Sequence, residues 1–490
     1  MNIDYFIQEL KKNLSKYIDE IKNIYQCDDN SALEYLNLCN NLLIEFKTLF
    51  PESKEIGIIR APGRVNLIGE HTDYNALPVL PIAIDKNIII IFSPVNDSTI
   101  RIYNHDPGFE YREFEISENT KPYETGDWGN YVKAGVLWNK EKGKKGFNAL
   151  IYGDIPSAAG LSSSSALVVA SALTFLQSNN INPDLLLLAD ELAKAEQYVG
   201  TMGGGMDQTI SLLGKENKAL QINFHPLSVK EVVIPNEICF VVINSLVKAP
   251  KTKNARLKYN RRPIECKIAL DVVNKYIVNR FNSAFNYSFI GNLVKSFPSF
   301  NQNFINDILD NVLNKESYST AQIVNILGID EEQFKDKYLL LKDGSYFDEP
   351  HDGFKLRQRF QYVIEEGLRV SRAVDALENN NITLFGKLMV ESYFGARDLY
   401  EISTPEIDFL VREALKCGAI GSRLTGAGFG GCVINLIYKK DAYSFLEKMK
   451  DLYFFKYIPE THPEISVNKN IVDNYIFICK PCRGAGLIFS

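Results

Sequence analysis

The sequence lacks the features that would place the protein in a membrane or on a nucleic acid. It has no uninterrupted apolar run close to the roughly 18 residues that a membrane-spanning helix requires. Residues 1–25 alternate charged with apolar side chains and have no apolar centre of the kind found in signal peptides. The 54 Lys and Arg residues are outnumbered by 60 Asp and Glu, giving a formal net charge of −6. We therefore expect a soluble cytoplasmic protein that binds neither nucleic acid nor membrane.

Cysteine and histidine are also scarce, with eight and five residues respectively. Cys479 and Cys482 form one CxxC pair, but no second pair follows at zinc-finger spacing. The cysteines stand mostly in apolar surroundings, which is typical of reduced thiols in the cytosol. We interpret the CxxC pair as structural rather than as a metal site.

The remaining composition is that of a globular protein, with 46% hydrophobic and 23% charged residues. A chain of 490 residues is long enough to divide into two to four domains. Hydrophobic periodicity predicts helices and strands in alternation, which favours a layered α+β or α/β fold. The predicted helices are 1–50, 166–176, 183–200, much of 303–341 and 351–378. The predicted strands are 82–94, 148–156 and 432–438, together with a strand–turn–strand unit at 57–71.

One loop has the composition of a phosphate-binding segment. Residues 156–166 connect a predicted strand to an apolar helix through small residues, and this arrangement points free backbone N–H groups at an anion. Gly160 allows a close approach of the backbone, and four serines in a row, Ser162–Ser165, add hydroxyl groups. The alternatives are a Ser-rich linker or simple N-capping by one serine. The common GxxxxGK[ST] phosphate loop does not occur in the sequence.

Two carboxylates follow this loop. Glu196 shares a helix face with Leu192 and Ala193, so it requires either a buried ion pair or a divalent cation such as Mg²⁺. Asp207 follows three consecutive glycines, residues 203–205, which bring the backbone close to another group. A turn with a solvated Asp207 is the alternative.

A third glycine-rich segment, residues 425–432, formally fits G-x-G-x-x-G at Gly426, Gly428 and Gly431. The dinucleotide-binding fingerprint requires a helix after these glycines, whereas the following residues predict a strand. We therefore reject a dinucleotide-binding fold.

The segment 63–75 reads GRVNLIGEHTDYN and combines an apolar run with charged residues at both ends. Arg64 precedes the run, and Glu70, His71 and Asp73 follow it. Charged groups beside core residues are costly unless other groups pair with them, so these four residues require partners that the segment itself does not supply.

Taken together, these segments resemble the GHMP kinase superfamily and, within it, the galactokinase family. The segment 63–75 is similar to the galactokinase signature, residues 156–167 to the second, phosphate-binding motif, and residues 422–432 to the third motif. The resemblance extends from about residue 58 to 486. Residues 355–370 resemble the longer subgroup that includes plant and fungal galactokinases and N-acetylgalactosamine kinase.

The resemblance implies a two-lobed GHMP kinase fold with the active site between the lobes. Residues 1–224 would form the N-terminal lobe, which is ribosomal protein S5 domain 2-like. Residues 225–490 would form the C-terminal lobe, with ferredoxin-like elements. The segment from about 282 to 350 would be a helical elaboration of the longer subgroup, to which we assign no role. We expect a monomer.

The implied activity is ATP-dependent phosphorylation of the anomeric hydroxyl of D-galactose, which yields α-D-galactose 1-phosphate. In such a kinase, positioning and charge neutralisation dominate catalysis. By resemblance, Asp207 would accept the proton of the anomeric hydroxyl or orient it, and Arg64 would lie beside Asp207 and the transferred phosphoryl group. Ser164 and Glu196 would hold Mg²⁺, although the exact serine among the four is open.

The resemblance also implies the binding residues. The ATP phosphates would lie on Gly160, Leu161, Ser162, Ser163, Ser164 and Ser165, with Trp128 on the nucleotide side. The sugar would contact Glu70, His71, Asp73, Gly204 and Tyr259. For Tyr259 and Trp128, packing in the core is the alternative.

Three positions depart from the galactokinase pattern: residues 76–78, Gly205 and Tyr393. The first two lie beside the expected sugar pocket, so a kinase for another sugar, N-acetylgalactosamine or arabinose, is the first alternative. A non-catalytic sensor of galactose and ATP is the second. The full-length GLSSSSA segment at 160–166 argues against a silent sensor.

Overall fold

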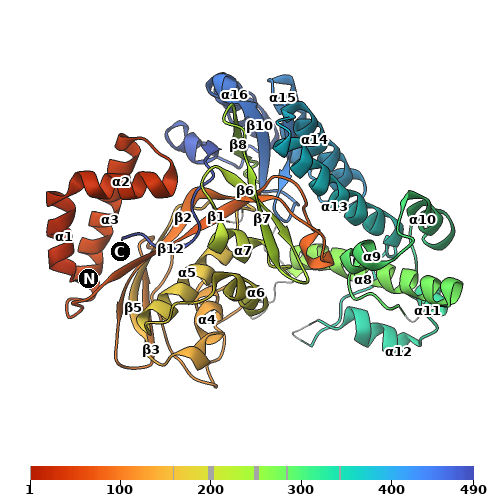
Figure 1. Cartoon of the computed structure of the whole chain (residues 1–490), viewed down its shortest axis with the longest axis horizontal. Helices are drawn as coiled ribbons and strands as arrows, with labels where there is room; N and C mark the ends of the chain where they lie inside the picture. The colour runs from red at the N-terminus through yellow and green to blue at the C-terminus, as the bar shows by residue number, and fades with distance from the viewer. Residues whose placement is uncertain are drawn as a thin grey trace.

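The computed structural model describes residues 2–157, 159–196, 203–247, 253–282, 285–341 and 344–489, with the backbone alone at 253–258 and 470. The chain forms a six-stranded sheet, a four-stranded sheet and a two-stranded sheet, with helices around them (Figure 1). In the described residues, no helix is both long and apolar enough to cross a membrane.

The six-stranded sheet has the strand order β12–β1–β2–β5–β3–β4. Its strands are β1 (Gly57–Asn66), β2 (Pro81–Pro94), β3 (Thr99–Asn104), β4 (Arg112–Glu115), β5 (Phe147–Gly153) and β12 (Gly486–Leu487). The predicted strand–turn–strand unit at 57–71 is wrong, because β1 is one strand that pairs with β2 and shifts register between Pro62 and Arg64. Proline donates no ladder hydrogen bond and is tolerated at such a bulge, and a bulge redirects the side chains after it. In β1 the redirected side chain is that of Arg64.

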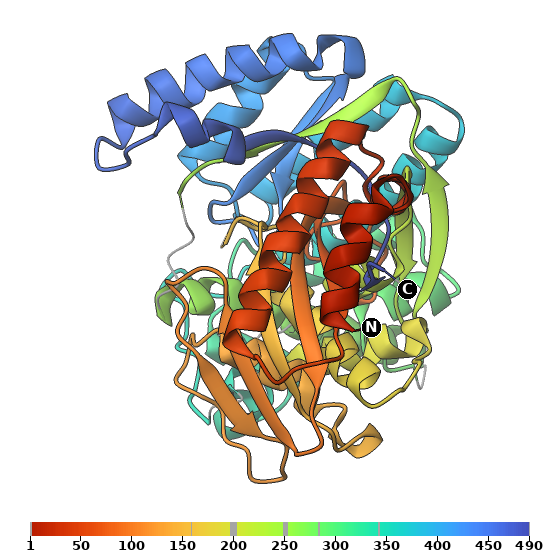
Figure 2. The same ribbon diagram turned by 90° about the vertical axis from the view of Figure 1, so that its left-hand side faces the viewer.

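Helices cover both faces of this sheet, and the isoleucines of β2 explain how. Ile89 and Ile91 belong to a core cluster with α1 (Ile3–Lys12), α2 (Leu14–Tyr25) and α3 (Asp29–Leu49). Ile88 and Ile90 point to the opposite face and join a core cluster with the other helices of this half. Figure 2 shows α1–α3 lying across the strands. Helical structure was predicted for residues 1–50, and this prediction is confirmed.

The helices on the opposite face carry the predicted phosphate loop. They are α4 (Gly129–Leu137), α5 (Ser163–Ser178), α6 (Leu185–Ala195) and α7 (Met206–Leu213). Nearly every residue of α5 is buried, as its apolar sequence predicts. Helix α7 was not predicted, because three glycines precede it and the segment resembled a turn.

The four-stranded sheet is antiparallel and has the order β11–β8–β10–β9. Its strands are β8 (Ile238–Asn244), β9 (Gly421–Thr425), β10 (Cys432–Tyr438) and β11 (Ile476–Cys479). Helices connect β8 to β9 and β10 to β11, which gives the βαββαβ sequence of ferredoxin-like folds. The expected ferredoxin-like elements are therefore present. A separate hairpin joins β6 (Lys218–Asn223) to β7 (Ser228–Val233).

The helices of this half of the chain lie beside the second sheet and extend away from it (Figure 1). They are α8 (Lys253–Phe281), α13 (Leu356–Glu378), α14 (Ile382–Asp398), α15 (Pro405–Lys416), α16 (Ala442–Met449) and α17 (Ile458–Thr461). The predicted helical elaboration at 282–350 contains α9 (Ile290–Ser296), α10 (Gln302–Asp307), α11 (Thr320–Leu327) and α12 (Glu331–Phe334). The division at residue 224 stays a prediction. Strand β12, close to the end of the chain, belongs to the first sheet.

Candidate active site

The phosphate loop and the third glycine-rich motif are in direct backbone contact. Gly160 and Gly426 both have positive φ angles, of 77° and 88°. A Cβ atom at Gly160 would lie 2.8 Å from the Thr425 carbonyl oxygen, and one at Gly426 would lie 2.6 Å from the Gly160 carbonyl oxygen. Only glycine combines this conformation with this close approach. The two motifs, far apart in the sequence, therefore form one surface.

Arg64 and Asp207 form a two-point ion pair next to this surface. Nε of Arg64 lies 2.8 Å from one Asp207 carboxylate oxygen, and Nη2 lies 3.1 Å from the other. Arg64 also donates to the Gly160 carbonyl oxygen. The Arg64 side chain is 7% exposed and that of Asp207 is 25% exposed. The carboxylate is thus held in a fixed orientation and remains reachable by a ligand.

The start of α5 lies beside the same ion pair. The Arg64 amide donates to the Leu161 carbonyl oxygen at 3.1 Å, and the Ser162 hydroxyl donates to Asp207. Helix α5 begins at Ser163, so the N–H groups of its first turn have no partner within the helix. These groups and the helix dipole favour an anion at this place.

Glu196 is the C-cap residue that follows α6 and is buried, with 8% exposure. Its two carboxylate oxygens accept from the Ser165 hydroxyl at 3.0 and 2.9 Å, and Gln208 donates to one of them. Burial and the charge of Asp207 raise the pKa of Glu196 to about 7. In the described residues, no basic side chain lies within ion-pair distance of Glu196, so the buried ion pair weighed from the sequence is not formed there. Gln208 was missed by the sequence analysis, although it directly follows Asp207.

Glu70 is held beneath the third motif. One of its oxygens accepts from the Gly426 amide at 2.8 Å and lies 3.5 Å from Nη1 of Arg423. The side chain of Glu70 is almost fully buried, and burial raises its pKa. Arg423 could not be predicted as a partner of this acid, because the two residues are 353 positions apart in the sequence.

His71 has protein partners at both ring nitrogens. Nδ1 lies 2.8 Å from the Tyr74 hydroxyl, and Nε2 lies 3.1 Å from the Ala427 carbonyl oxygen. A carbonyl only accepts, so Nε2 carries the hydrogen and Nδ1 accepts from Tyr74. Burial lowers the pKa of His71 to about 3, which keeps the ring neutral. Its ring centroid lies 5.5 Å from that of Tyr259, so the structure brings Tyr259 to this segment.

Asp73 belongs to residues 63–75, called the sugar segment below because the resemblance places the sugar there, and connects this segment to the glycines before α7. It lies in a single 3-10 turn, η1 (Asp73–Asn75), and accepts from the Gly204 amide at 3.1 Å. Burial and the charge of Asp207 raise the pKa of Asp73 to about 6. A Cβ atom at Gly204 would lie only 2.3 Å from the Tyr74 nitrogen. Gly204 therefore has to be glycine for this contact to form.

The variant Gly204→Ala should raise the KM for the sugar about tenfold or more, because the added methyl group forces Asp73 away from its position. Steady-state kinetics with varied sugar checks this expectation. The matched control is Gly203→Ala, since a Cβ atom at Gly203 would meet no atom of the described residues within 4 Å. Equal KM values for the two variants would contradict the role of the Gly204–Asp73 contact.

Trp128 immediately precedes α4, and its ring centroid lies 6.1 Å from that of Phe109. The side chain packs against the edge of the main core cluster, as the core alternative predicts. Its indole Nε1 is nevertheless buried without a hydrogen-bond partner in the part of the chain that the structure describes. The nucleotide role of Trp128 stays a prediction.

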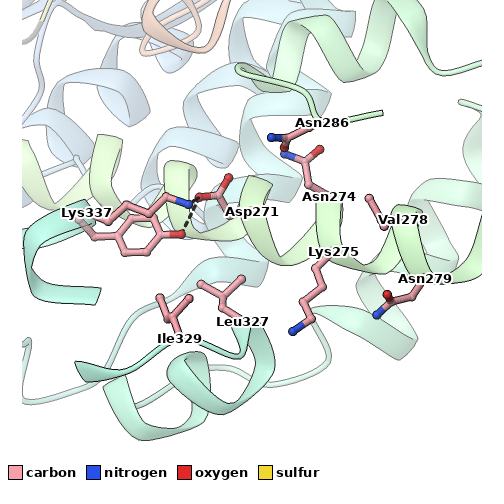
Figure 3. Close-up of a pocket in the computed structure, with 10 residues that line it drawn as sticks. Asp271, Asn274, Lys275, Val278, Asn279, Asn286, Leu327, Ile329 and Lys337 are labelled. Carbon is pink, nitrogen blue, oxygen red and sulfur yellow. Dashed lines mark hydrogen bonds and ion pairs between the residues drawn. The ribbon is translucent and has the colours of Figure 1, made fainter. Parts of the chain in front are cut away.

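A separate groove lies between α8 and the helical elaboration (Figure 3). Its volume is about 350 Å³, and Asp271 on its wall contacts both Lys337 and the Tyr338 hydroxyl. None of the predicted site residues lines this groove.

Comparisons with known families and proteins show which family this chain belongs to. Residues 44–94 match the galactokinase galactose-binding signature, residues 130–215 the GHMP kinases N-terminal domain, and residues 373–454 the GHMP kinases C-terminal domain. A galactokinase of Dictyostelium discoideum is 33% identical to this chain, over 97% of this chain and 98% of the relative. A galactokinase of Saccharomyces cerevisiae is 30% identical, over 92% and 94% of the two chains.

Solved structures show the same fold. Lactococcus lactis galactokinase complexed with galactose superposes with a TM-score of 0.70 at 26% identity, covering 92% of this chain and 99% of that chain. The mevalonate kinase of Methanococcus jannaschii has a TM-score of 0.50 at 18% identity, covering 88% and 99%, and supports the fold alone. With a relative 33% identical along nearly its whole length, the chain belongs to the galactokinase family of the GHMP kinases.

Proposed function

We propose that this protein transfers the γ-phosphoryl group of ATP to the anomeric hydroxyl of D-galactose, giving α-D-galactose 1-phosphate and ADP. The observation that carries this proposal is the two-point Arg64–Asp207 pair, which lies between the start of α5 and the sugar segment. The relatives named galactokinase and the match to the galactose-binding signature support galactose as the acceptor.

The site residues divide the work of phosphoryl transfer among them. Asp207 would accept the hydrogen bond of the anomeric hydroxyl and receive its proton as the new P–O bond forms and the bond from the γ-phosphorus to the bridging oxygen breaks, which releases ADP. Arg64 orients that carboxylate and places a positive charge where negative charge develops on the phosphoryl oxygens. The N–H groups at the start of α5 would bind the phosphates of ATP.

The oxygen ligands around Glu196 fit Mg²⁺. Glu196 and Ser165 offer hard oxygen atoms in contact with one another, and in the described residues Glu196 has no basic partner within ion-pair distance. In the described residues, no group of three His, Cys, Asp or Glu side chains could hold a metal. Mg²⁺ is commonly held by one or two protein ligands together with phosphates, where it neutralises phosphate charge. The resemblance assigns the hydroxyl ligand to Ser164, whereas the hydroxyl in contact with Glu196 is that of Ser165.

The sugar segment supplies acceptors and donors in fixed directions for a hexose. Glu70 and Asp73 are held by backbone amides of Gly426 and Gly204, so their positions are set before a sugar binds. A site with such fixed polar groups discriminates against a sugar that leaves one of them unpaired. We also retain a monomer and a cytoplasmic location as predictions.

A kinase assay with a panel of sugars tests the proposal. Purified protein with MgATP should release ADP most efficiently with galactose, as measured by kcat/KM. N-Acetylgalactosamine and arabinose are the comparison sugars, because residues 76–78 and Gly205 depart from the family pattern. A higher kcat/KM for either would reassign the substrate. Binding of galactose and ATP with no turnover would support the sensor alternative.

A further inference from the structure

A buried carboxylate on α13 reaches the sugar segment from the C-terminal half of the chain. Glu366 is 0% exposed, and one of its oxygens accepts from the Gly69 amide at 2.8 Å. The same oxygen accepts from the Ser392 hydroxyl of α14 at 2.6 Å, while the other oxygen pairs with Nη1 of Arg369. Three donors from different elements thus converge on one carboxylate.

Ser392 extends this arrangement to a second contact with the sugar segment. Nε of Arg423, which is fully buried on β9, lies 3.1 Å from the Ser392 hydroxyl oxygen. Nη1 of Arg423 then donates to the Asn66 carbonyl oxygen at 3.1 Å and lies 3.5 Å from Glu70. The backbone on both sides of Leu67 and Ile68 is therefore held from α13, α14 and β9.

The backbone at Gly69 has little freedom to find another position. Its φ angle is +99°, and a Cβ atom there would lie 2.8 Å from a Val370 side-chain carbon of α13. The Gly69 amide hydrogen bond therefore fixes the direction in which the chain enters Glu70 and the turn containing Asp73. Shifts of about 1 Å in such groups weaken the match to a ligand.

We propose that Glu366 is a positioning residue for sugar binding, acting through the Gly69 amide and, with Ser392 and Arg423, on the backbone of residues 66–70. This inference rests on the proposed function, because it assigns the 66–73 segment to the sugar. Glu366 would contact no reacting atom. Through the backbone of residues 66–70 it would fix the positions of Glu70 and Asp73.

The neighbouring acid on the same helix provides a matched control. Glu365 also pairs with Arg369, at 2.8 Å, and otherwise accepts from Gln361 one turn earlier on α13. Its side chain is 41% exposed, and no described hydrogen bond joins it to the sugar segment. Glu365 and Glu366 therefore share Arg369 but differ in the contact with Gly69.

The test compares Glu366→Gln with Glu365→Gln in steady-state kinetics. The side-chain amide introduced by Glu366→Gln would place N–H donors against Gly69, Ser392 or Arg369, all of which are donors themselves. The KM for galactose should rise about tenfold in Glu366→Gln, with the KM for ATP unchanged and kcat within about threefold of wild type. Glu365→Gln should match the wild type in all three constants.

Hydrogen–deuterium exchange provides a readout that does not depend on turnover. Peptides covering residues 66–73 should exchange faster in Glu366→Gln and in Ser392→Ala than in Glu365→Gln. If circular dichroism shows that Glu366→Gln does not fold, Ser392→Ala takes its place. The galactose KM and the exchange rates of Ser392→Ala then test the inference.

The outcomes separate this inference from the proposed function. An unchanged galactose KM together with unchanged exchange in the Glu366 and Ser392 variants would overturn the inference. A loss of kcat alone would also overturn it, because such a loss indicates only fewer folded molecules. If the wild type phosphorylates no sugar, the proposed function fails. Because the inference assigns the 66–73 segment to the sugar, it fails as well in that case; with an active wild type, the variants test the inference alone.

Discussion

Replacing Asp207 with asparagine should lower kcat for galactose about a thousandfold, while the KM for ATP stays near its wild-type value. The asparagine side chain has nearly the same shape, so Ser162 and the start of α5 keep their places. What is lost is the anionic acceptor for the anomeric proton and the ionic part of the two-point pair with Arg64. Rapid-quench measurement of the phosphoryl-transfer step distinguishes this loss from a change in product release.

The control for this experiment is Asp190→Asn. Asp190 lies on α6 in the same half of the chain, but it is half exposed and pairs with Lys194 at the surface. Its replacement should leave kcat and both KM values as in the wild type. A kcat for Asp207→Asn within about tenfold of wild type would show that Asp207 does not accept the proton of the anomeric hydroxyl.

The parts of the site that lie within one local segment could be predicted from the sequence. The loop 156–166 joins a strand to an apolar helix over few residues, and local hydrophobic patterning suffices to predict that geometry. Local patterning also predicts the strand after Gly431, which is β10 in the structure. A dinucleotide-binding fold was rejected because this segment is a strand and not a helix. In both segments the determining residues are neighbours in the chain.

Contacts between distant residues could not be predicted in this way. The Glu366–Gly69 contact joins residues 297 positions apart, and the Glu70–Gly426 contact spans 356. Periodicity marks Glu366 only as one charged residue on a long amphipathic helix, where a solvated position is the usual outcome. The partner of a buried charge is set by tertiary packing, for which a single sequence gives no signal.

Two local errors have a different physical cause. Pro62 and Gly63 resemble a turn, but pairing with β2 keeps β1 continuous and absorbs them in a bulge. The three glycines before Met206 resemble a loop, yet α7 begins directly after them and places Asp207 in its first turn. In both places tertiary contacts override the local preference of proline and glycine.

Replacing Glu196 with glutamine should have two opposite effects. Activity at saturating Mg²⁺ should fall about a hundredfold or more, because the neutral amide supports the cation less well. The protein without metal or nucleotide should become more stable at pH 8. Glu196 is buried beside Asp207 without a basic partner in the described residues, and its pKa is raised from 4.5 to about 7.

The sign of the stability effect follows from the raised pKa. A carboxyl group that binds its proton more tightly in the folded state contributes full stability below pH 4.5, and this contribution is lost as the pH rises through about 7. The loss from pH 4.5 to 8 is of the order of 3 kcal/mol. Glutamine has no charge to bury, so the gain in free energy of unfolding over wild type should be larger at pH 8 than at pH 5.

Urea-induced unfolding at the two pH values, with EDTA present, measures this difference. Glu191→Gln is the control, because Glu191 lies on the same helix with its side chain 37% exposed and pairs with Lys142. It should show the same small change at both pH values. If Glu196→Gln, like the control, changed the free energy of unfolding by the same amount at pH 5 and pH 8, the charge of Glu196 would be compensated within the fold. The site would then have no unpaired negative charge with which to attract a cation, and the assignment of Glu196 to Mg²⁺ would lose its physical basis.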